Sequence, residues 1–170
     1  MNIEIRGETG ADVAVIEAVT AAAFLDAPHT SHTEQFIVNG LRRAGQLTVS
    51  LVAEVAGQVI GHVAVSPVSI SDGTAGWFGL GPISVLPEYQ RRGVGSRLMR
   101  EALSVLQRQG AAGCVVLGEP EYYGRFDFRA DPSLVLPDVP PEYFQAVAFG
   151  SYRPRGIVSY HSAFSSRDPG

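Results

Sequence analysis

The chain has 170 residues and a formal net charge of −4, and 45% of its residues are hydrophobic while 18% are charged. This length and composition predict a single domain over residues 1–170 with a sizeable core. The acidic balance gives no general reason to bind nucleic acid, and the lone cysteine, Cys114, excludes an internal disulfide.

No segment of the sequence is typical of a membrane span or a secretory signal. The longest apolar candidate, residues 49–67, is interrupted by Glu54 and His62 and falls short of about 18 unbroken apolar residues. Residues 1–10 include three charged side chains where a secretory signal would have an apolar run. We therefore expect a soluble, cytoplasmic protein with no membrane partner.

The first half of the chain predicts a strand, two helices and a β-hairpin. Asp12 is a candidate N-cap for the first helix, and residues 56–58 are short enough for a hairpin turn. The predicted elements are a strand at residues 2–6, a helix at 12–24, a loop at 26–31, a helix at 33–44, and strands at 48–55 and 59–65.

The second half begins with an irregular strand followed by a helix. Residues 77–86 have a strand pattern, but Gly79, Gly81 and Pro82 predict a bulge or a close approach of another backbone. The later elements are a helix from Val94 that ends at Gly110, a strand at 113–117, a short helix at 119–126, and extended segments near 128–136, 144–149 and 156–160. Strands that alternate with helices after an early hairpin indicate an α/β or α+β layered sheet.

The stretch QRRGVGS, residues 90–96, directly precedes an amphipathic helix and predicts an anion site. A P-loop is excluded because the required lysine followed by Ser or Thr is missing, and a Rossmann fingerprint fits poorly because Leu98 stands at the third glycine position. A helix N-terminus offers free N–H groups, and glycines let a phosphate approach closely. A plain turn with two solvated arginines is the alternative interpretation.

The segment LGPISVLPEYQRRGVGSRLM resembles the acetyl-coenzyme A-binding motif of the GNAT superfamily of N-acetyltransferases, with Gln90, Gly93 and Gly95 at its defining positions. EYYGRFDF, residues 121–128, resembles a second family segment, although Asp127 replaces the usual glycine. The segments VIGHVAVSPV and YHSAF are similar to those of a bacterial subgroup of this superfamily, the YhbS-like N-acetyltransferases. The resemblance implies the GNAT fold, whose mixed, mostly antiparallel sheet is splayed between strands 4 and 5 and flanked by helices.

The resemblance also implies an N-acetyltransferase that uses acetyl-coenzyme A (acetyl-CoA) as co-substrate. The acetyl group would move to a primary amine of a small molecule or a peptide, by direct attack on the thioester. Backbone groups of the irregular strand would pair with pantetheine, and the glycine turn would surround the pyrophosphate. The coenzyme-binding residues implied in this way are Ile83, Ser84, Val85, Leu86, Gln90, Arg91, Arg92, Gly93, Val94, Gly95 and Ser96.

Tyr123 matches the family's tyrosine that acts as general acid toward the leaving thiolate, whereas its neighbour Tyr122 is expected to pack. The general base stays open, because residues 77–85 contain no acidic side chain. Glu119 and His62 are the two candidates. Glu119 could instead cap the following helix, His62 could be a strand histidine with a satisfied hydrogen bond, and a water chain could replace both.

Cys114 is expected to be an inert core residue because its surroundings are apolar. His29 and His32 could form a metal pair with Asp26, but no third ligand has convincing spacing in the sequence. We therefore expect no metal. Two other functions are considered, an acyl-coenzyme A sensor without turnover and an acetyltransferase that acts on RNA. A late exposed strand could pair two copies into a homodimer.

Overall fold

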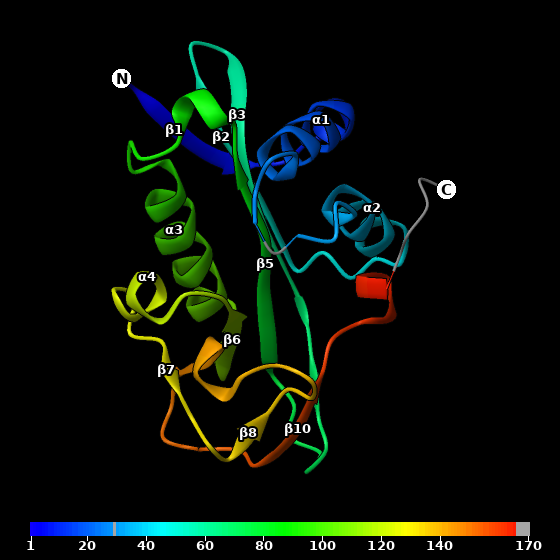
Figure 1. Ribbon diagram of the computed structural model, residues 1–170, viewed down its shortest axis with the longest axis vertical. Coiled ribbons are helices and arrows are strands. Elements are labelled where there is room, and N and C mark those ends of the chain that lie inside the picture. Colours follow the sequence, from blue (N-terminus) through cyan, green and yellow to red (C-terminus); the bar gives the residue numbers. More distant parts are fainter. Residues whose placement is uncertain (29, 166–170) are drawn as a thin grey trace.

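The computed structural model describes residues 1–28 and 30–165 and shows helices on both faces of a central sheet (Figure 1). In the described part of the chain the strand order is β1-β2-β3-β5-β6-β9-β7. All neighbouring strands are antiparallel except β5 and β6. The strands of this sheet are β1 (Ile3–Gly7), β2 (Val49–Val55), β3 (Gln58–Pro67), β5 (Trp77–Val85), β6 (Gly113–Leu117), β7 (Arg129–Ala130) and β9 (Phe144–Ala148).

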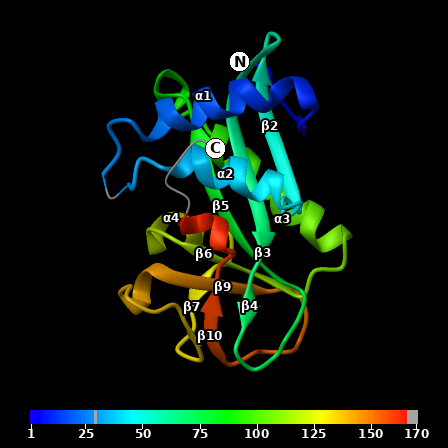
Figure 2. The same cartoon turned by 90° about the vertical axis from the view of Figure 1, so that its right-hand side faces the viewer.

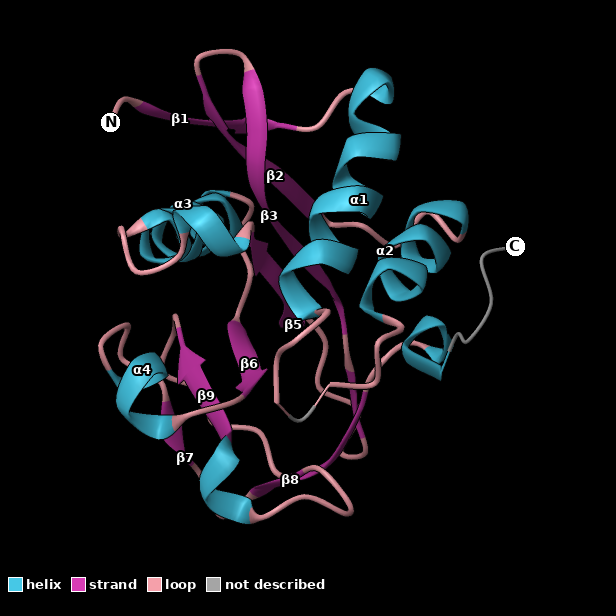
Figure 3. Cartoon of the chain, turned by 45° about the horizontal axis from the view of Figure 1, so that its top comes forward, coloured by secondary structure: helices cyan, strands magenta, loops and turns pink. Residues whose placement is uncertain are grey.

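Two helices cover each face of the sheet. Helices α3 (Val94–Arg108) and α4 (Pro120–Gly124) lie on one face, and α1 (Val13–Phe24) and α2 (Glu34–Arg43) lie on the other (Figures 1 and 3). Figure 2 looks onto α1 and α2, which cross in front of the long strands. The predicted layered α/β arrangement is confirmed. No helix in the described ranges is long and apolar enough to cross a membrane.

Most early elements begin and end close to their predicted bounds. The β2–β3 hairpin is confirmed, and Ala56 and Gly57 at its turn have φ of +50° and +80°, as a type I′ turn requires. The predicted cap of α1 is wrong. Asp12 ends a short 3-10 turn, and its carboxylate accepts hydrogen bonds from Thr9 N and Arg6 Nη1, both at 2.7 Å, in place of an N–H of α1.

Strands β5 and β6 pair over a very short stretch and then separate. The paired residues are Trp77 with Gly113, Phe78 with Cys114, and Gly79 with Val115. Beyond Gly79, β5 continues to Val85 with pairing to β3, while β6 pairs with β9. The predicted splay is confirmed, and the strands numbered 4 and 5 in the sequence prediction are β5 and β6 here.

Two glycines allow close packing on either side of the splay. A Cβ on Gly61 of β3 would lie 3.2 Å from Leu98 Cδ1 and 3.3 Å from Val94 Cγ1, so its absence lets the first turns of α3 rest on the sheet. On the opposite face, a Cβ on Gly79 would overlap the ring of Tyr160. These contacts place the start of α3 beside the free end of β5.

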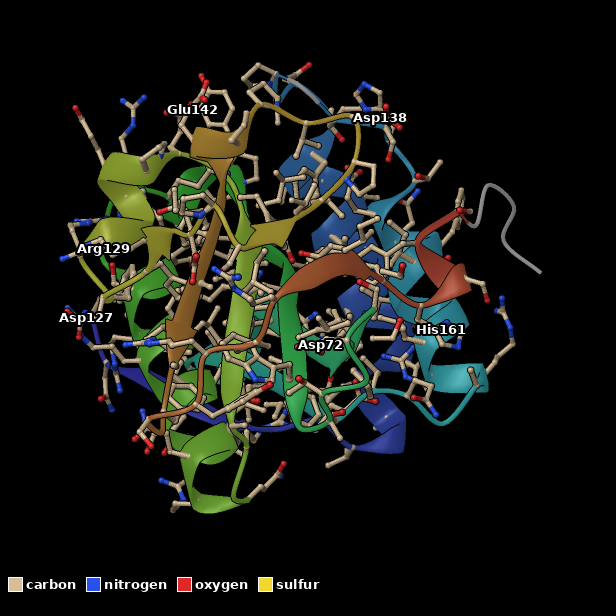
Figure 4. All side chains as sticks on the ribbon, turned by 90° about the horizontal axis from the view of Figure 1, so that it is seen from below. Asp72, Asp127, Arg129, Asp138, Glu142 and His161 are labelled. Atoms are coloured by element: carbon tan, nitrogen blue, oxygen red, sulfur yellow. The ribbon has the colours of Figure 1, made fainter. Side chains whose placement is uncertain are left out.

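A second, small sheet closes the lower end of the molecule and is absent from the sequence prediction. Its strands are β4 (Ser69–Ile70), β10 (Gly156–Ser159) and β8 (Leu134–Val135), in the order β4-β10-β8. Asp72 ties the turn after β4 to the segment before β10, because its carboxylate accepts a hydrogen bond from Arg155 N at 3.0 Å. Figure 4 shows Asp72 between Arg129 on one side and His161 on the other. The predicted extended segments near residues 128–136 and 156–160 contain β8 and β10, but β4 and the pairing of these strands were not predicted.

Candidate functional site

A cavity of about 440 Å³ lies where the end of β5 meets the start of α3 and one side of α4. Its walls contain backbone and side chains from three separate segments of the chain. The lining residues are Ile83, Val85, Tyr89, Gln90, Arg91, Gly93, Val94, Gly95, Ser96, Tyr122 and Arg125. No acidic side chain is among them, so the cavity favours an anionic ligand.

The start of α3 supplies N–H donors to this cavity. Gly93 is the N-cap residue and has a left-handed φ of +83°, and Arg91 before it also has a positive φ, of +64°. The first helical bond in this turn is Arg97 N to Gly93 O at 3.1 Å. The N–H groups of Val94, Gly95 and Ser96 therefore lack helical partners and carry the positive end of the helix dipole.

Gln90 and Gly95 shape the boundary between the turn and the strand. The side-chain amide of Gln90 donates to the carbonyl oxygen of Val85 at 3.0 Å, which joins the turn to the end of β5. A Cβ on Gly95 would lie 3.1 Å from the Tyr122 hydroxyl. The missing side chain at Gly95 thus keeps the helix start open to a ligand and close to α4.

The structure brings together most of the residues that the sequence implied for the coenzyme, but not all. Three of them do not line the cavity. The Ser84 side chain points to α1, where its Oγ lies 3.4 Å from Thr20 Oγ1. Leu86 packs among core residues. The guanidinium carbon of Arg92 lies 5.7 Å from the centre of the Tyr89 ring.

Sequence reasoning missed three lining residues, Tyr89, Tyr122 and Arg125. Tyr122 does pack, edge-on against Tyr123 with ring centres 4.9 Å apart, but it also forms a wall of the cavity. A signal was present, because residues three apart on a helix share a face. If Tyr122 is known to line the cavity, Arg125 is expected to line it as well.

Tyr123 lies behind Tyr122, at the end of β6. Gly118 has no side chain, and a Cβ there would overlap the Tyr123 ring, so the ring rests against the strand end. Its other face meets Phe128, with ring centres 6.1 Å apart. Burial raises the pKa of Tyr123 to about 12, and the neighbouring Tyr122 adds to the rise. Its hydroxyl is therefore protonated at neutral pH and available as a donor.

Glu119 follows β6 directly and stays exposed to solvent. It occupies the N-cap position of α4, yet its side chain makes no capping hydrogen bond, which contradicts the capping interpretation. Its carbonyl oxygen accepts the N–H of Tyr123 at 3.1 Å. The free carboxylate and the phenol therefore stand at the same end of β6.

His62 is fully buried beneath α1 and α2 and joins a polar network that reaches the surface. Its Nε2 lies 2.8 Å from Ser50 Oγ, and Ser50 Oγ in turn donates to the carboxylate of Glu8. Arg42 holds that carboxylate with two hydrogen bonds of 2.9 and 3.0 Å. His62 is not among the residues that line the cavity at the start of α3.

The directions of these hydrogen bonds set the protonation of His62. Burial acts to raise the pKa of Glu8, but hydrogen bonds from Arg42 and Ser50 outweigh it and the pKa lies below its ordinary value. Ionised Glu8 only accepts, so Ser50 donates to it and accepts from His62 Nε2–H. Burial lowers the pKa of His62 to about 4, and its Nδ1 has no partner in the described residues.

The remaining chemical candidates lie away from the cavity. Cys114 is buried, and burial raises the pKa of its thiol well above the usual range, so it resists forming a thiolate. His29 lies outside the described residues. Within the described ranges, no group of three or more His, Cys, Asp or Glu side chains could hold a metal ion.

Comparisons with known proteins agree on one family. The family described as Acetyltransferase (GNAT) domain matches residues 46–130. The chain is 38% identical to the uncharacterized N-acetyltransferase YhbS of Escherichia coli K12 over 126 residues, which cover 74% of this chain and 72% of the relative.

Two solved structures are similar over nearly the whole chain. One is a GNAT family acetyltransferase from Brucella melitensis in complex with acetyl-CoA, with 48% identity, a TM-score of 0.86 and coverage of 96% of this chain and 98% of that one. The other is YhbS from Escherichia coli in complex with CoA, with 33% identity, a TM-score of 0.88 and coverage of 98% and 93%.

The buried His62 predicts a loss of stability in mild acid. The folded protein holds His62 with a pKa of about 4, below the ordinary 6.5, so protons favour the unfolded chain as pH falls through 6.5 toward 4. Urea unfolding at a series of pH values should show a loss of about 2 kcal/mol between pH 6.5 and 4.5. The His62→Gln variant should lose clearly less, and an equal loss in both proteins would contradict the prediction.

Proposed function

This chain belongs to the GNAT acetyltransferase family, and we propose that it transfers the acetyl group of acetyl-CoA to a primary amine by direct attack of the amine on the thioester. The observation that carries the proposal is the anion-binding cavity at the start of α3, continuous with the unpaired edge of β5. The relatives solved with acetyl-CoA and with CoA support the same ligand for this cavity.

The free edge of β5 suits an extended pantetheine chain. Beyond Gly79 the backbone groups of β5 that face β6 have no strand partner in the part of the chain that the structure describes. An amide-containing chain can pair with them as a further strand would, and Ile83 and Val85 line the cavity there. The N–H groups of Gly93 to Ser96 then face the pyrophosphate. The acyl end is carried toward the point where β5 and β6 separate.

Tyr123 is proposed as the general acid toward the leaving thiolate. A phenol with a pKa of about 12 remains protonated, but its proton transfer to a thiolate with a reference pKa of about 8.5 is uphill by about three and a half pKa units. Burial in the same cleft disfavours the thiolate as well, which raises the pKa of the thiol and narrows the difference. Tyr123 is thereby a persistent hydrogen-bond donor that gives up its proton as the sulfur gains charge.

Glu119 is proposed as the general base in preference to His62. An acceptor amine with a reference pKa near that of lysine, about 10.4, is almost wholly protonated at pH 7, so its proton must leave before attack. His62 is buried with a pKa of about 4 and does not line the cavity at the start of α3. The exposed carboxylate of Glu119 has no capping bond to give up and lies at the same strand end as Tyr123.

Acetyl transfer is tested by incubating the purified chain with acetyl-CoA and a panel of amines. Thiol release that depends on the amine, with acetylated amine detected by mass spectrometry, is the expected result.

Gly95→Val should raise the acetyl-CoA dissociation constant at least about tenfold, because a side chain there meets the Tyr122 hydroxyl.

Gly150→Val is the matched control for Gly95→Val, since a Cβ at Gly150 has open space and the variant should behave as the parent.

In the activity assay, tight acetyl-CoA binding without thiol release for any amine would instead favour a sensor. Transfer only to an RNA-linked amine, with salt-dependent RNA binding, would favour the RNA-directed enzyme.

Removing the Tyr123 hydroxyl should slow chemistry and spare coenzyme binding. We expect Tyr123→Phe to lower kcat about 10-fold or more, as loss of proton transfer does, with the acetyl-CoA dissociation constant changed less than about threefold. Steady-state kinetics and calorimetry measure the two effects. Tyr122→Phe is the control, because its hydroxyl borders the helix start, and it should weaken acetyl-CoA binding more than it lowers kcat. Unchanged kcat in Tyr123→Phe removes the residue from the role.

Replacing Glu119 should impair deprotonation of the amine. Glu119→Gln is expected to lower kcat/KM for the amine about 10-fold or more at pH 7, with recovery as pH rises and free amine becomes abundant. Glu121→Gln, which neutralises the exposed carboxylate in the first turn of α4, is the control. The assignment of the base would be reversed if a folded His62→Gln protein lost this activity while Glu119→Gln kept it.

A further inference from the structure

Arg125 presents a fixed guanidinium at the mouth of the cavity without an acidic partner. The guanidinium carbon lies 4.5 Å from the centre of the Tyr122 ring and 5.8 Å from that of Phe126. Its Nε donates to the carbonyl oxygen of Tyr122 at 3.3 Å. Its terminal nitrogens form no ion pair with any residue in the described part of the chain. Stacking holds the group in place, and its outer N–H donors stay open to a ligand.

Positive groups from two different elements line the cavity. The start of α3 presents backbone N–H groups together with the side chain of Arg91. Arg125 adds a second guanidinium from the opposite wall, on the C-terminal side of α4. Because no carboxylate lines the cavity, none of this charge is neutralised within it. A ligand with a further anionic group fits this wall.

Tyr122 separates the two positive regions. Its hydroxyl lies beside Gly95 at the start of α3, while the Arg125 guanidinium covers the ring. The two regions therefore lie at different parts of Tyr122, one at its hydroxyl and the other over its ring face. Arg125 also borders a neighbouring cavity of about 490 Å³ together with Arg100 and Asp127, so the space beyond it is open. No ion pair joins Asp127 to Arg125 among the described residues.

We propose that Arg125 binds the 3′-phosphate of coenzyme A and is the residue by which the protein distinguishes coenzyme A from dephospho-coenzyme A. The proposal rests on the proposed function, since it assigns a second phosphate of the same co-substrate. In coenzyme A the 3′-phosphate is separated from the pyrophosphate by the ribose, so the two anionic groups can reach the two regions at Tyr122 separately. A planar guanidinium forms two parallel hydrogen bonds to a phosphate, and stacking on Tyr122 orders it beforehand.

The test compares two ligands that differ only in the 3′-phosphate. Dissociation constants of coenzyme A and dephospho-coenzyme A are measured by calorimetry at low ionic strength for the parent chain, Arg125→Gln and Arg125→Lys. Arg125→Gln should weaken coenzyme A about 10-fold and change dephospho-coenzyme A less than about threefold. Arg125→Lys should lie between the parent and Arg125→Gln. The preference for coenzyme A should shrink as salt is added, because Arg125 is exposed.

Arg108→Gln is the matched control. It removes the same charge from an exposed arginine at the other end of α3, where the partner is Glu101 at 3.3 Å, and it should leave both affinities unchanged. Equal weakening of the two ligands by Arg125→Gln would mean that Arg125 acts only through Tyr122, and it would overturn the proposal. So would no weakening at all. A parent chain that binds neither ligand would instead refute the proposed function.

Discussion

The short contact between β5 and β6 is the constraint on which the site depends. Three residue pairs hold the two parallel strands together, after which, among the described residues, β5 pairs with β3 and β6 pairs with β9. A backbone edge that lacks a partner is costly when buried, so it must face solvent or a ligand that supplies the missing hydrogen bonds. The following elements, α3 after β5 and α4 after β6, begin on either side of this opening. The start of α3 and the C-terminal part of α4 form walls of the cavity.

Burial separates the titratable groups into two classes. His62, Cys114 and Tyr123 are withdrawn from water, and in each the neutral form is favoured, with a lowered pKa for the imidazole and raised pKa values for the thiol and the phenol. Glu119 and Arg125 stay exposed at the rim. The exposed guanidinium of Arg125 suits attraction of an anionic co-substrate, while the Tyr123 hydroxyl at the strand end keeps its proton.

Glycines mark the places where other groups come close, and the groups differ from case to case. At Gly61 the close neighbours are the side chains of Val94 and Leu98 on α3, and at Gly95 the neighbour is the Tyr122 hydroxyl. At Gly118 it is the ring of Tyr123. Only Gly95 and Gly118 border the site. A glycine in the sequence therefore indicates that another group comes close, but it does not identify that group. The contact partner is a property of the folded chain.

The amino-acid sequence alone predicted most of the elements along the chain, the hairpin, the irregular β5 and the glycine turn before α3, because periodicity, turn residues and motif spacing act over a few neighbouring positions. The sequence alone could not place Arg125 or Tyr122 on the cavity, nor show that Glu119 leaves its carboxylate uncapped. It also could not place His62 away from the cavity at the start of α3. Those outcomes depend on how strands distant in sequence diverge and which faces they bury, and only the tertiary structure decides them.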